Sequence, residues 1–138
     1  MLTDLASDIK VTQSINPAAQ TGTVNGAAVQ ITDFISATVV FHIGALGGGA
    51  ASFKVQESPD GTNNWVDIAS TRLIGTLAAA QANSTQKVGV NDLGSLTLPF
   101  IRPVITVVGG TGVFASASVI QGDAKISPVG SSGSVYIA

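Results

Sequence analysis

The sequence predicts an all-β protein, an antiparallel β-sandwich of jelly-roll-like form with about eight or nine short strands. Three observations predict this fold. The 138 residues are enough for one domain with its own core. Short β-branched runs alternate with Gly, Asn, Asp and Pro. Only Thr76–Ser84 has a helix-friendly composition, and it is too short to form a stable helix alone. We expect strands near Ile9–Ser14, Ala27–Ile31, Ala37–Ile43, Ala51–Glu57, Trp65–Ser70, Lys87–Val90, Phe100–Val107, Val113–Gln121 and Ser134–Ile137.

The chain is expected to have three parts. Residues 1–26 form an N-terminal arm or first strand, residues 27–126 form the sandwich, and residues 127–138 form a C-terminal linker and tail. The acidic start, MLTDLASDIK, lacks the apolar stretch of a secretory signal. Either end could add a strand to a neighbouring subunit, or it could be a frayed terminus. The candidate partner contacts in the tail are Val135, Tyr136 and Ile137.

Two stretches of twenty residues, Phe34–Phe53 and Pro103–Gly122, contain no formally charged residue. Each is long enough for one membrane span. However, a Gly-rich segment interrupts both of them, so we interpret each as strand, turn and strand, and we expect no membrane association. In Gly44–Ser52, two Ala residues stand where a phosphate-binding loop needs Lys and Ser or Thr. We therefore expect this segment and Val107–Phe114 to be simple hairpin connections.

The segment Ser52–Ser70 predicts a β-hairpin. Phe53 and Val55 alternate with polar residues, which indicates one apolar and one solvated face. The turn formers Pro, Asp and Gly follow at positions 59–61. A second alternating run then begins at Trp65, the single Trp of the chain. We expect Trp65 to cover its own hairpin or the sandwich edge, although it could also serve as a platform for a sugar. Trp65 is therefore a further candidate partner contact.

The hairpin loop also offers oxygen ligands. Asp60 begins the pattern of an EF-type calcium loop, but Trp65 and Thr71 stand where that pattern needs Gly and Glu. A looser oxygen site formed by Asp60, Asn63 and Asp67 stays open. A hydrogen-bonded turn is the favoured interpretation. We therefore predict no metal and no cofactor.

The sequence contains no recognisable catalytic signature. It has no Cys, and His42 is its single His. Strand alternation places His42 on the more polar face of its strand, where a structural role is the usual one. The acidic pairs Asp4 with Asp8 and Asp60 with Asp67 lie in polar surroundings with nothing to separate their pKa values. We predict that the protein is not an enzyme and has no catalytic residues.

The charge of the chain limits its partners. The net charge is −2, and the six Lys and Arg residues are scattered, so no basic surface is available for nucleic acid. Charged residues make up 10% of the chain, well below the roughly 25% of an ordinary soluble domain. Such a surface suits a subunit that is held permanently in an assembly.

Two runs of the sequence resemble a group of small structural proteins of tailed bacteriophages. The runs are SATVVFHIGAL followed by ASFKVQESPDGTNNWVDIAS, and LPFIRPVITVVGGTGVFASASVIQGDAK. In that group a strand ending in QES and DG precedes W.DI, IRP.ITV.GG and a final apolar strand. The resemblance covers roughly Ser36 to Lys125 by pattern alone. These motifs belong to a β scaffold rather than to an active site.

The resemblance implies a capsid decoration (cement) protein, located on the exterior of the virion and made in the host cytoplasm. The implied partners are the major capsid protein and further copies of the chain, with a trimer favoured. It implies no catalytic residues. Two alternatives stay open, namely a neck or tail subunit of the phage and a carbohydrate-binding β-sandwich.

Overall fold

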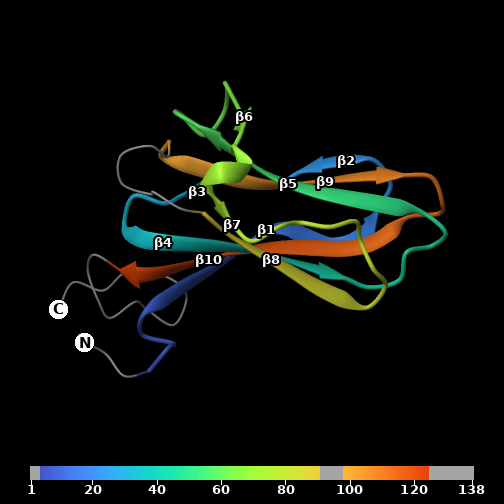
Figure 1. Cartoon of the computed structure of the whole chain (residues 1–138), viewed down its shortest axis with the longest axis horizontal. Coiled ribbons are helices and arrows are strands. Elements are labelled where there is room, and N and C mark those ends of the chain that lie inside the picture. The colour runs from blue at the N-terminus through green and yellow to red at the C-terminus, as the bar shows by residue number, and fades with distance from the viewer. Residues whose placement is uncertain (1–3, 91–97, 125–138) are drawn as a thin grey trace.

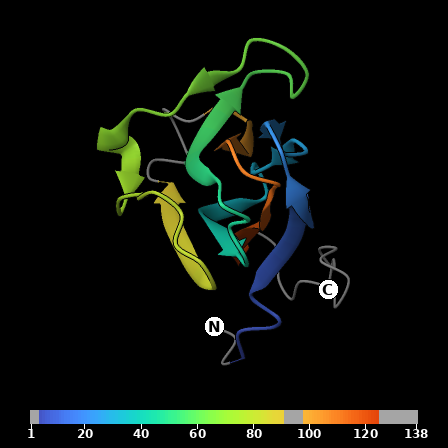
Figure 2. The same ribbon diagram turned by 90° about the vertical axis from the view of Figure 1, so that its right-hand side faces the viewer.

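The chain folds into two antiparallel β-sheets that pack face to face (Figures 1 and 2). The computed structural model describes residues 4–90 and 98–124. The elements are β1 (Ile9–Gln20), β2 (Thr23–Asn25), β3 (Val29–Gln30), β4 (Phe34–Ile43), β5 (Ala50–Ser58), β6 (Val66–Asp67), the 3-10 turn η1 (Ser70–Arg72), β7 (Leu73–Ile74), β8 (Ser84–Val90), β9 (Phe100–Val108) and β10 (Val113–Ala124).

The first sheet, sheet A, has the strand order β1-β10-β4-β8-β7. The second, sheet B, has the order β2-β9-β5-β6, and β3 also pairs with β9. Every ladder in the described part of the chain is antiparallel. The prediction of an all-β antiparallel sandwich is therefore confirmed. None of the helical structure in residues 4–90 and 98–124 is long and apolar enough to cross a membrane.

Strand alternation produces the core. In β4, Val39, Phe41 and Ile43 are buried, while His42 between them is exposed, as predicted. In β10 every second residue from Val113 to Val119 is buried in the same way. The two layers meet where Phe41 of sheet A packs on Phe53 of sheet B, with ring centroids 4.7 Å apart. Aromatic pairs at this separation add stabilisation beyond the area that they bury.

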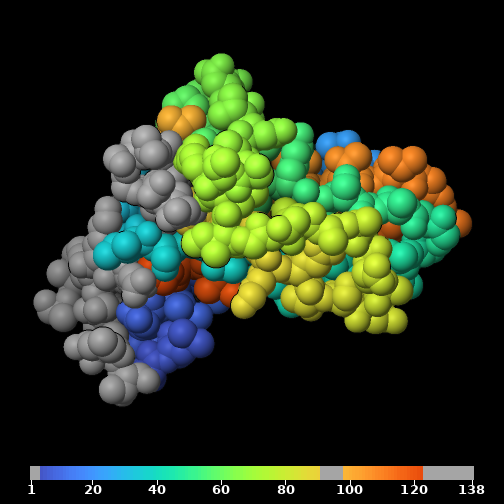
Figure 3. Space-filling model, in the orientation of Figure 1, coloured from blue at the N-terminus to red at the C-terminus, as the bar shows by residue number. Residues whose placement is uncertain are grey.

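One predicted strand differs in the structure, and one segment of helix-friendly composition is not helical. The segment Thr76–Ser84 forms no α-helix, and β8 already begins at Ser84. The preceding loop is held beside β8 because the Gln86 side chain accepts from the Ala78 N–H (2.9 Å) and donates to the Ala78 carbonyl (3.1 Å). The predicted strand Trp65–Ser70 is shortened to β6, since the chain turns at η1 to bring Arg72 toward β5. In Figure 3 the segment from β6 to β8, coloured lime to yellow, covers this side of the sandwich.

The two Gly-rich connections are not hairpins, so that prediction was wrong. Each crosses from one sheet to the other, because β4 and β10 lie in sheet A whereas β5 and β9 lie in sheet B. The two crossings pack against each other. The Thr111 N–H donates to the Gly47 carbonyl (3.0 Å), and the Gly44 N–H donates to the Phe114 carbonyl (2.7 Å). Closure of one end of the sandwich thus requires two backbones in direct contact.

The N-terminal segment contributes strands to both sheets. β1 continues past the predicted end at Ser14 to Gln20 and pairs with β10 from Ile9–Gly122 to Gln20–Val113. β2 then joins sheet B. At the other end, the tail of residues 127–138 lies outside the described residues, and so do the predicted strand Ser134–Ile137 and the candidate contacts Val135, Tyr136 and Ile137.

Candidate interaction surfaces

A buried ion pair holds the base of the hairpin to the 3-10 turn. Glu57, the only Glu in the sequence, is buried at the end of β5. Its two carboxylate oxygens accept from the two terminal nitrogens of Arg72, at 2.6 and 3.1 Å. The Leu98 N–H also donates to this carboxylate (2.9 Å). Burial raises the pKa of Glu57, but the hydrogen bonds from Arg72 and Leu98 and the positive charge outweigh it, so the pKa lies below its usual value.

The hairpin loop is a hydrogen-bonded turn, as the favoured interpretation held. The Asp60 carboxylate accepts from the backbone N–H groups of Thr62 (3.0 Å) and Asn63 (2.8 Å). These bonds, with the one to Asn63 the stronger, lower the pKa of Asp60. Asp67 is engaged elsewhere, by Lys54 at 3.2 Å. The residues described contain no group of three acidic or His side chains that could hold a metal ion.

The outer face of sheet B carries a chain of polar contacts around Trp65. The Arg102 guanidinium lies 4.2 Å from the centre of the half-buried Trp65 ring. Arg102 donates to the Gln56 amide oxygen through two nitrogens, at 3.0 and 2.8 Å. Gln56 in turn donates to Asp67 (2.9 Å), which pairs with Lys54. Trp65 therefore covers its own hairpin, but it does so by stacking on Arg102 rather than by entering the core.

The outer face of sheet A has a different character. At one level of the sheet the cross-strand register joins one residue from each of the five strands. We call this set the sheet A row; it consists of Val11, Ile120, Thr38, Gly89 and Ile74. Val11 and Ile74, at the two ends, are 55% and 63% exposed, and the three residues between them are half-buried. The row presents three aliphatic residues, one Thr and one Gly across the whole width of the sheet, and none of them is charged.

The neighbouring level of the same face contains Gln13, Ser118, Val40 and Lys87. Lys87 is the single formally charged residue in these two levels. A shallow hollow of about 440 Å³ lies beside Ile74 and is lined partly by Lys87. This face therefore has very little charge, in contrast to sheet B.

His42 lies on this face, one level further along. Its cross-strand neighbours are Thr85 on β8 and Ser116 on β10. The side chain is exposed, and none of these neighbours is acidic. The arrangement supplies no partner for acid–base chemistry within the described residues.

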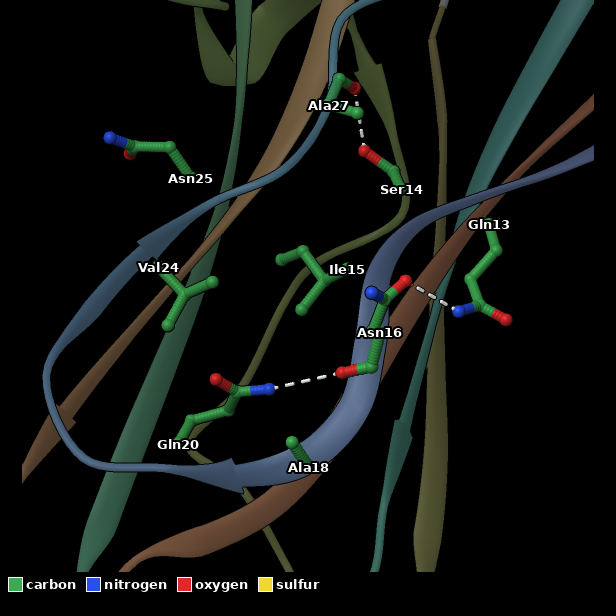
Figure 4. A pocket seen from close by; sticks show the side chains of 9 residues that line it. All are labelled: Gln13, Ser14, Ile15, Asn16, Ala18, Gln20, Val24, Asn25 and Ala27. Atoms are coloured by element: carbon green, nitrogen blue, oxygen red, sulfur yellow. Dashed lines mark hydrogen bonds between the residues drawn. The ribbon is translucent and has the colours of Figure 1, made fainter.

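A second, polar hollow of about 390 Å³ opens between the sheets, where β1 turns into β2 (Figure 4). Ile15 and Val24 face each other across it, and Gln20 lies at its base. The Gln20 amide donates to the Asn16 carbonyl (3.1 Å) and to the Ala115 carbonyl (3.2 Å). We call this the β1–β2 hollow; it is lined by Gln13, Ser14, Ile15, Asn16, Ala18, Gln20, Val24, Asn25 and Ala27.

Comparison with known proteins finds no family model that matches the chain. No curated protein matches it either. Among solved structures, the chain is similar to the crystal structure of YomS, a protein derived from the SPBc2 prophage. The two are 17% identical with a TM-score of 0.45, and the match covers 88% of this chain and 96% of that one. At this level of similarity, the function has to be argued from the surfaces of the chain itself.

Sequence analysis alone missed both the partner of Trp65 and the sheet A row. Alternation within β4 does indicate that Thr38 points away from the core. The sequence carries no signal for its cross-strand neighbours Ile120 and Gly89, which come from strands distant in the chain.

Proposed function

We propose that this chain is a non-enzymatic structural protein of a tailed-phage particle, and that it decorates the assembled capsid through the outer face of sheet A. The observation that carries the proposal is the sheet A row. Contiguous exposed apolar surface marks interaction sites, and charged residues are depleted at the centres of interfaces. Ile74 and Val11, at the ends of the row, are the most exposed apolar side chains in it.

The size of this face fits the role. Sheet A has five strands, and β8 is seven residues long. Because β7 is only two residues long, four strands span this length; with strands about 4.8 Å apart and residues about 3.4 Å apart, the flat area is roughly 460 Å², more than half of the roughly 800 Å² that each partner buries in a standard interface. Side-chain relief and the neighbouring loops add to the flat value. One sheet face can therefore supply most of a stable contact.

The motifs of the phage resemblance support a structural role because the fold itself uses them. Glu57 anchors η1 through Arg72. Ser58 and Asp60 hold the turn, where the Ser58 hydroxyl donates to the Asn63 carbonyl (2.5 Å). Each of these groups has a bonding partner within the fold.

The mechanism is stabilisation by mass action. A protein that binds the assembled shell and not its separated subunits lowers the free energy of the shell by RT ln(1 + [L]/Kd), which is about 2.7 kcal/mol per site at a hundredfold excess over Kd. No chemical step is needed, and the face has only to be rigid and complementary. The two-layer packing beneath sheet A supplies this rigidity.

The test compares two exposed aliphatic residues on opposite sheets. Ile74→Glu places a charge in the sheet A row, whereas Val108→Glu places one at the end of β9 in sheet B, opposite Ala50; the side chains are 63% and 71% exposed. Each purified variant is added to undecorated heads, and bound copies are counted after washing. We expect Ile74→Glu to weaken binding at least about tenfold, or about 1.4 kcal/mol, and Val108→Glu to bind like the parent.

Two results would contradict the proposal. Equal binding by both variants would remove sheet A as the contact face. Bound copies numbering about six or twelve per particle, rather than several hundred, would indicate a ring in the neck or tail.

A further inference from the structure

We propose that the β1–β2 hollow receives the C-terminal segment Ser134–Ile137 of a second copy of this chain, added as a strand along β1. This inference goes beyond capsid decoration, because it concerns how copies of the chain join one another and is tested without capsids. It rests on the open edge of β1, on the lining of the hollow and on the reach of the tail.

The hollow exists because β1 leaves its ladder there. The register with β10 shifts between Gln13 and Ile15 and again between Ile15 and Ala18. Pro17 lies in the second shift and has no N–H to give to a ladder. The Gln20 side chain takes over one of the released bonds by donating to the Ala115 carbonyl. The irregularity is thus supported from within the fold, as β-bulges at sheet edges usually are.

The outer edge of β1 is available. β1 is the last strand of sheet A, and no further strand pairs with it among the residues that the structure describes. Residue Ser14 closes one end of the hollow, since its carbonyl accepts from the Ala27 N–H (2.9 Å) and its hydroxyl donates to the Ala27 carbonyl (2.7 Å). Beyond this point the Asn16 carbonyl already accepts from Gln20 (3.1 Å) and Pro17 has no N–H, so an extended peptide would pair with the backbone groups that remain along this edge.

The lining matches an uncharged extended segment. Ile15 is buried and Val24 is half-buried, so the two facing walls that they form are apolar, with Gln20 at the base. Gln13, Asn16 and Asn25 lie at the rim, where the Gln13 amide donates to the Asn16 amide oxygen (2.7 Å); amides can both donate to and accept from a peptide backbone. No residue of the lining carries a formal charge.

The tail has the complementary pattern. Val135 and Ile137 are two residues apart, so in an extended strand they project on one side and Tyr136 on the other. After Lys125 the sequence has no charged residue up to Ala138. The side with Val135 and Ile137 suits the apolar walls formed by Ile15 and Val24, and Tyr136 would face solvent or the rim.

The reach of the tail favours a second copy over the chain's own hollow. Every ladder described in this fold is antiparallel, so a strand added to β1 would run in the opposite direction to β1. Ser134 would then lie beside Ala18, which pairs with Ala115 of β10. The distance along β10 from Ala115 to Ala124 is nine residues, or about 31 Å. The ten steps from Ala124 to Ser134 span at most about 33–36 Å, and a free chain of that length averages about 18 Å. Insertion into its own hollow would demand full extension, whereas insertion into a neighbour carries no such limit.

Exchange of this kind is head-to-tail, because the donated segment and the receiving hollow are different surfaces. Such interfaces close into rings when the rotation allows it. A closed ring of three copies would match a threefold junction between capsomers. The tail would then stabilise the ring, while sheet A stays free for the shell.

The test uses two adjacent exposed alanines on β1. Ala18 lines the hollow, whereas Ala19 does not and pairs with Phe114. The proteins are the full chain, a form lacking Ser131–Ala138, and full-length Ala18→Arg and Ala19→Arg. Their masses in solution are measured by light scattering after gel filtration, and folding is checked by circular dichroism. We expect the full chain and Ala19→Arg to be oligomeric, and the truncated form and Ala18→Arg to be monomeric.

A mixing experiment separates exchange between copies from indirect effects. The truncated form keeps an open hollow, and Ala18→Arg keeps an intact tail, so an equimolar mixture should form one-to-one dimers and nothing larger.

A peptide experiment tests the same contact directly. A synthetic peptide of residues 130–138 should bind the truncated form at least about tenfold more tightly than it binds the truncated form with Ala18→Arg. The truncated form with Ala19→Arg should bind the peptide as tightly as the truncated form itself. An oligomeric truncated form, a monomeric full chain, or a peptide that ignores Ala18→Arg would overturn the proposal. None of these results bears on whether sheet A binds heads.

Discussion

At the scale of single residues, the polar groups of this protein serve the fold. Glu57 is buried and bonded to both Arg72 and Leu98, so a charge at the end of β5 joins three separate stretches of chain. Asp67 has a looser environment, since its contact with Lys54 involves side chains that are 61% and 47% exposed. The two ion pairs therefore differ greatly in what they contribute.

Glu57→Gln should lower the free energy of unfolding by about 1.5–3 kcal/mol, because it removes charge-assisted hydrogen bonds from a buried site. Asp67→Asn is the matched control and should cost less than about 1 kcal/mol, since exposed pairs contribute little. Urea unfolding of the three proteins measures both effects. Equal losses would mean that the Glu57 pair is no stronger than a surface contact.

The same pair predicts the acid sensitivity of the protein. The pKa of Glu57 is lowered in the folded state, so folding favours its ionised form. The stability from this group is fully present above the unfolded-state pKa of about 4.3 and is lost as the pH falls below that value through the lower folded-state pKa. Wild type should lose more stability between about pH 5 and 3 than Glu57→Gln does. Parallel curves for the two proteins would refute this assignment.

Trp65 provides another residue-scale prediction. Its ring is half-buried and lies over Arg102, so Arg102→Ala should shift Trp fluorescence to longer wavelength by exposing the ring. A double-mutant cycle of Trp65→Ala and Arg102→Ala should give a coupling of about 0.5–1 kcal/mol. A sugar platform would behave differently, since Trp65→Ala would abolish glycan binding without changing the melting temperature. A glycan screen beside the thermal scan distinguishes the two.

At the scale of elements, the contact between the two Gly-rich crossings is the least replaceable part of the fold. Gly47 and Gly110 both have positive φ, at 59° and 69°. A Cβ on Gly110 would lie 2.6 Å from the Gly47 carbonyl oxygen. The close approach of two backbones explains why glycines gather in both segments.

Gly110→Ala should therefore destabilise the protein by about 3 kcal/mol or more, combining left-handed strain with overpacking. Gly109→Ala is the control, because Gly109 has a similar φ of 72° but an added Cβ would meet no atom within 4 Å. It should cost only about 1–2 kcal/mol. Thermal or urea unfolding measures the difference. Equal costs would show that the crossings tolerate a side chain between them.

At the scale of the whole molecule, the two sheets divide the surface by chemistry. Sheet B holds Arg102, Lys54 and Asp67 in a connected polar network. The two levels of sheet A described above carry Lys87 as their single charge.

If sheet A binds the assembled shell, decorated heads should rupture at a higher temperature than bare heads, by an amount that grows with the number of bound copies. If heads bind the protein but rupture at the same temperature as bare heads, then binding does not stabilise the shell.

Much of the fold was predictable from the sequence because strand periodicity and turn chemistry are local. Alternation placed Phe41 inside and His42 outside, and the Pro-Asp-Gly run marked the hairpin turn correctly. The same local signal failed at the Gly-rich segments. A hairpin and a crossing between sheets both need Gly, and only the pairing partners of the flanking strands distinguish them.

By itself the sequence determined the fold class, the main strands and which side chains of each strand face the core. The tertiary structure alone decided which strands are neighbours, and hence the sheet A row, the Glu57–Arg72 pair and the stacking of Arg102 on Trp65. The physical reason is the range of the interactions. Burial pattern and turn geometry act over a few residues, whereas the surfaces proposed to bind partners are assembled from strands that meet only when the two sheets close on a common core.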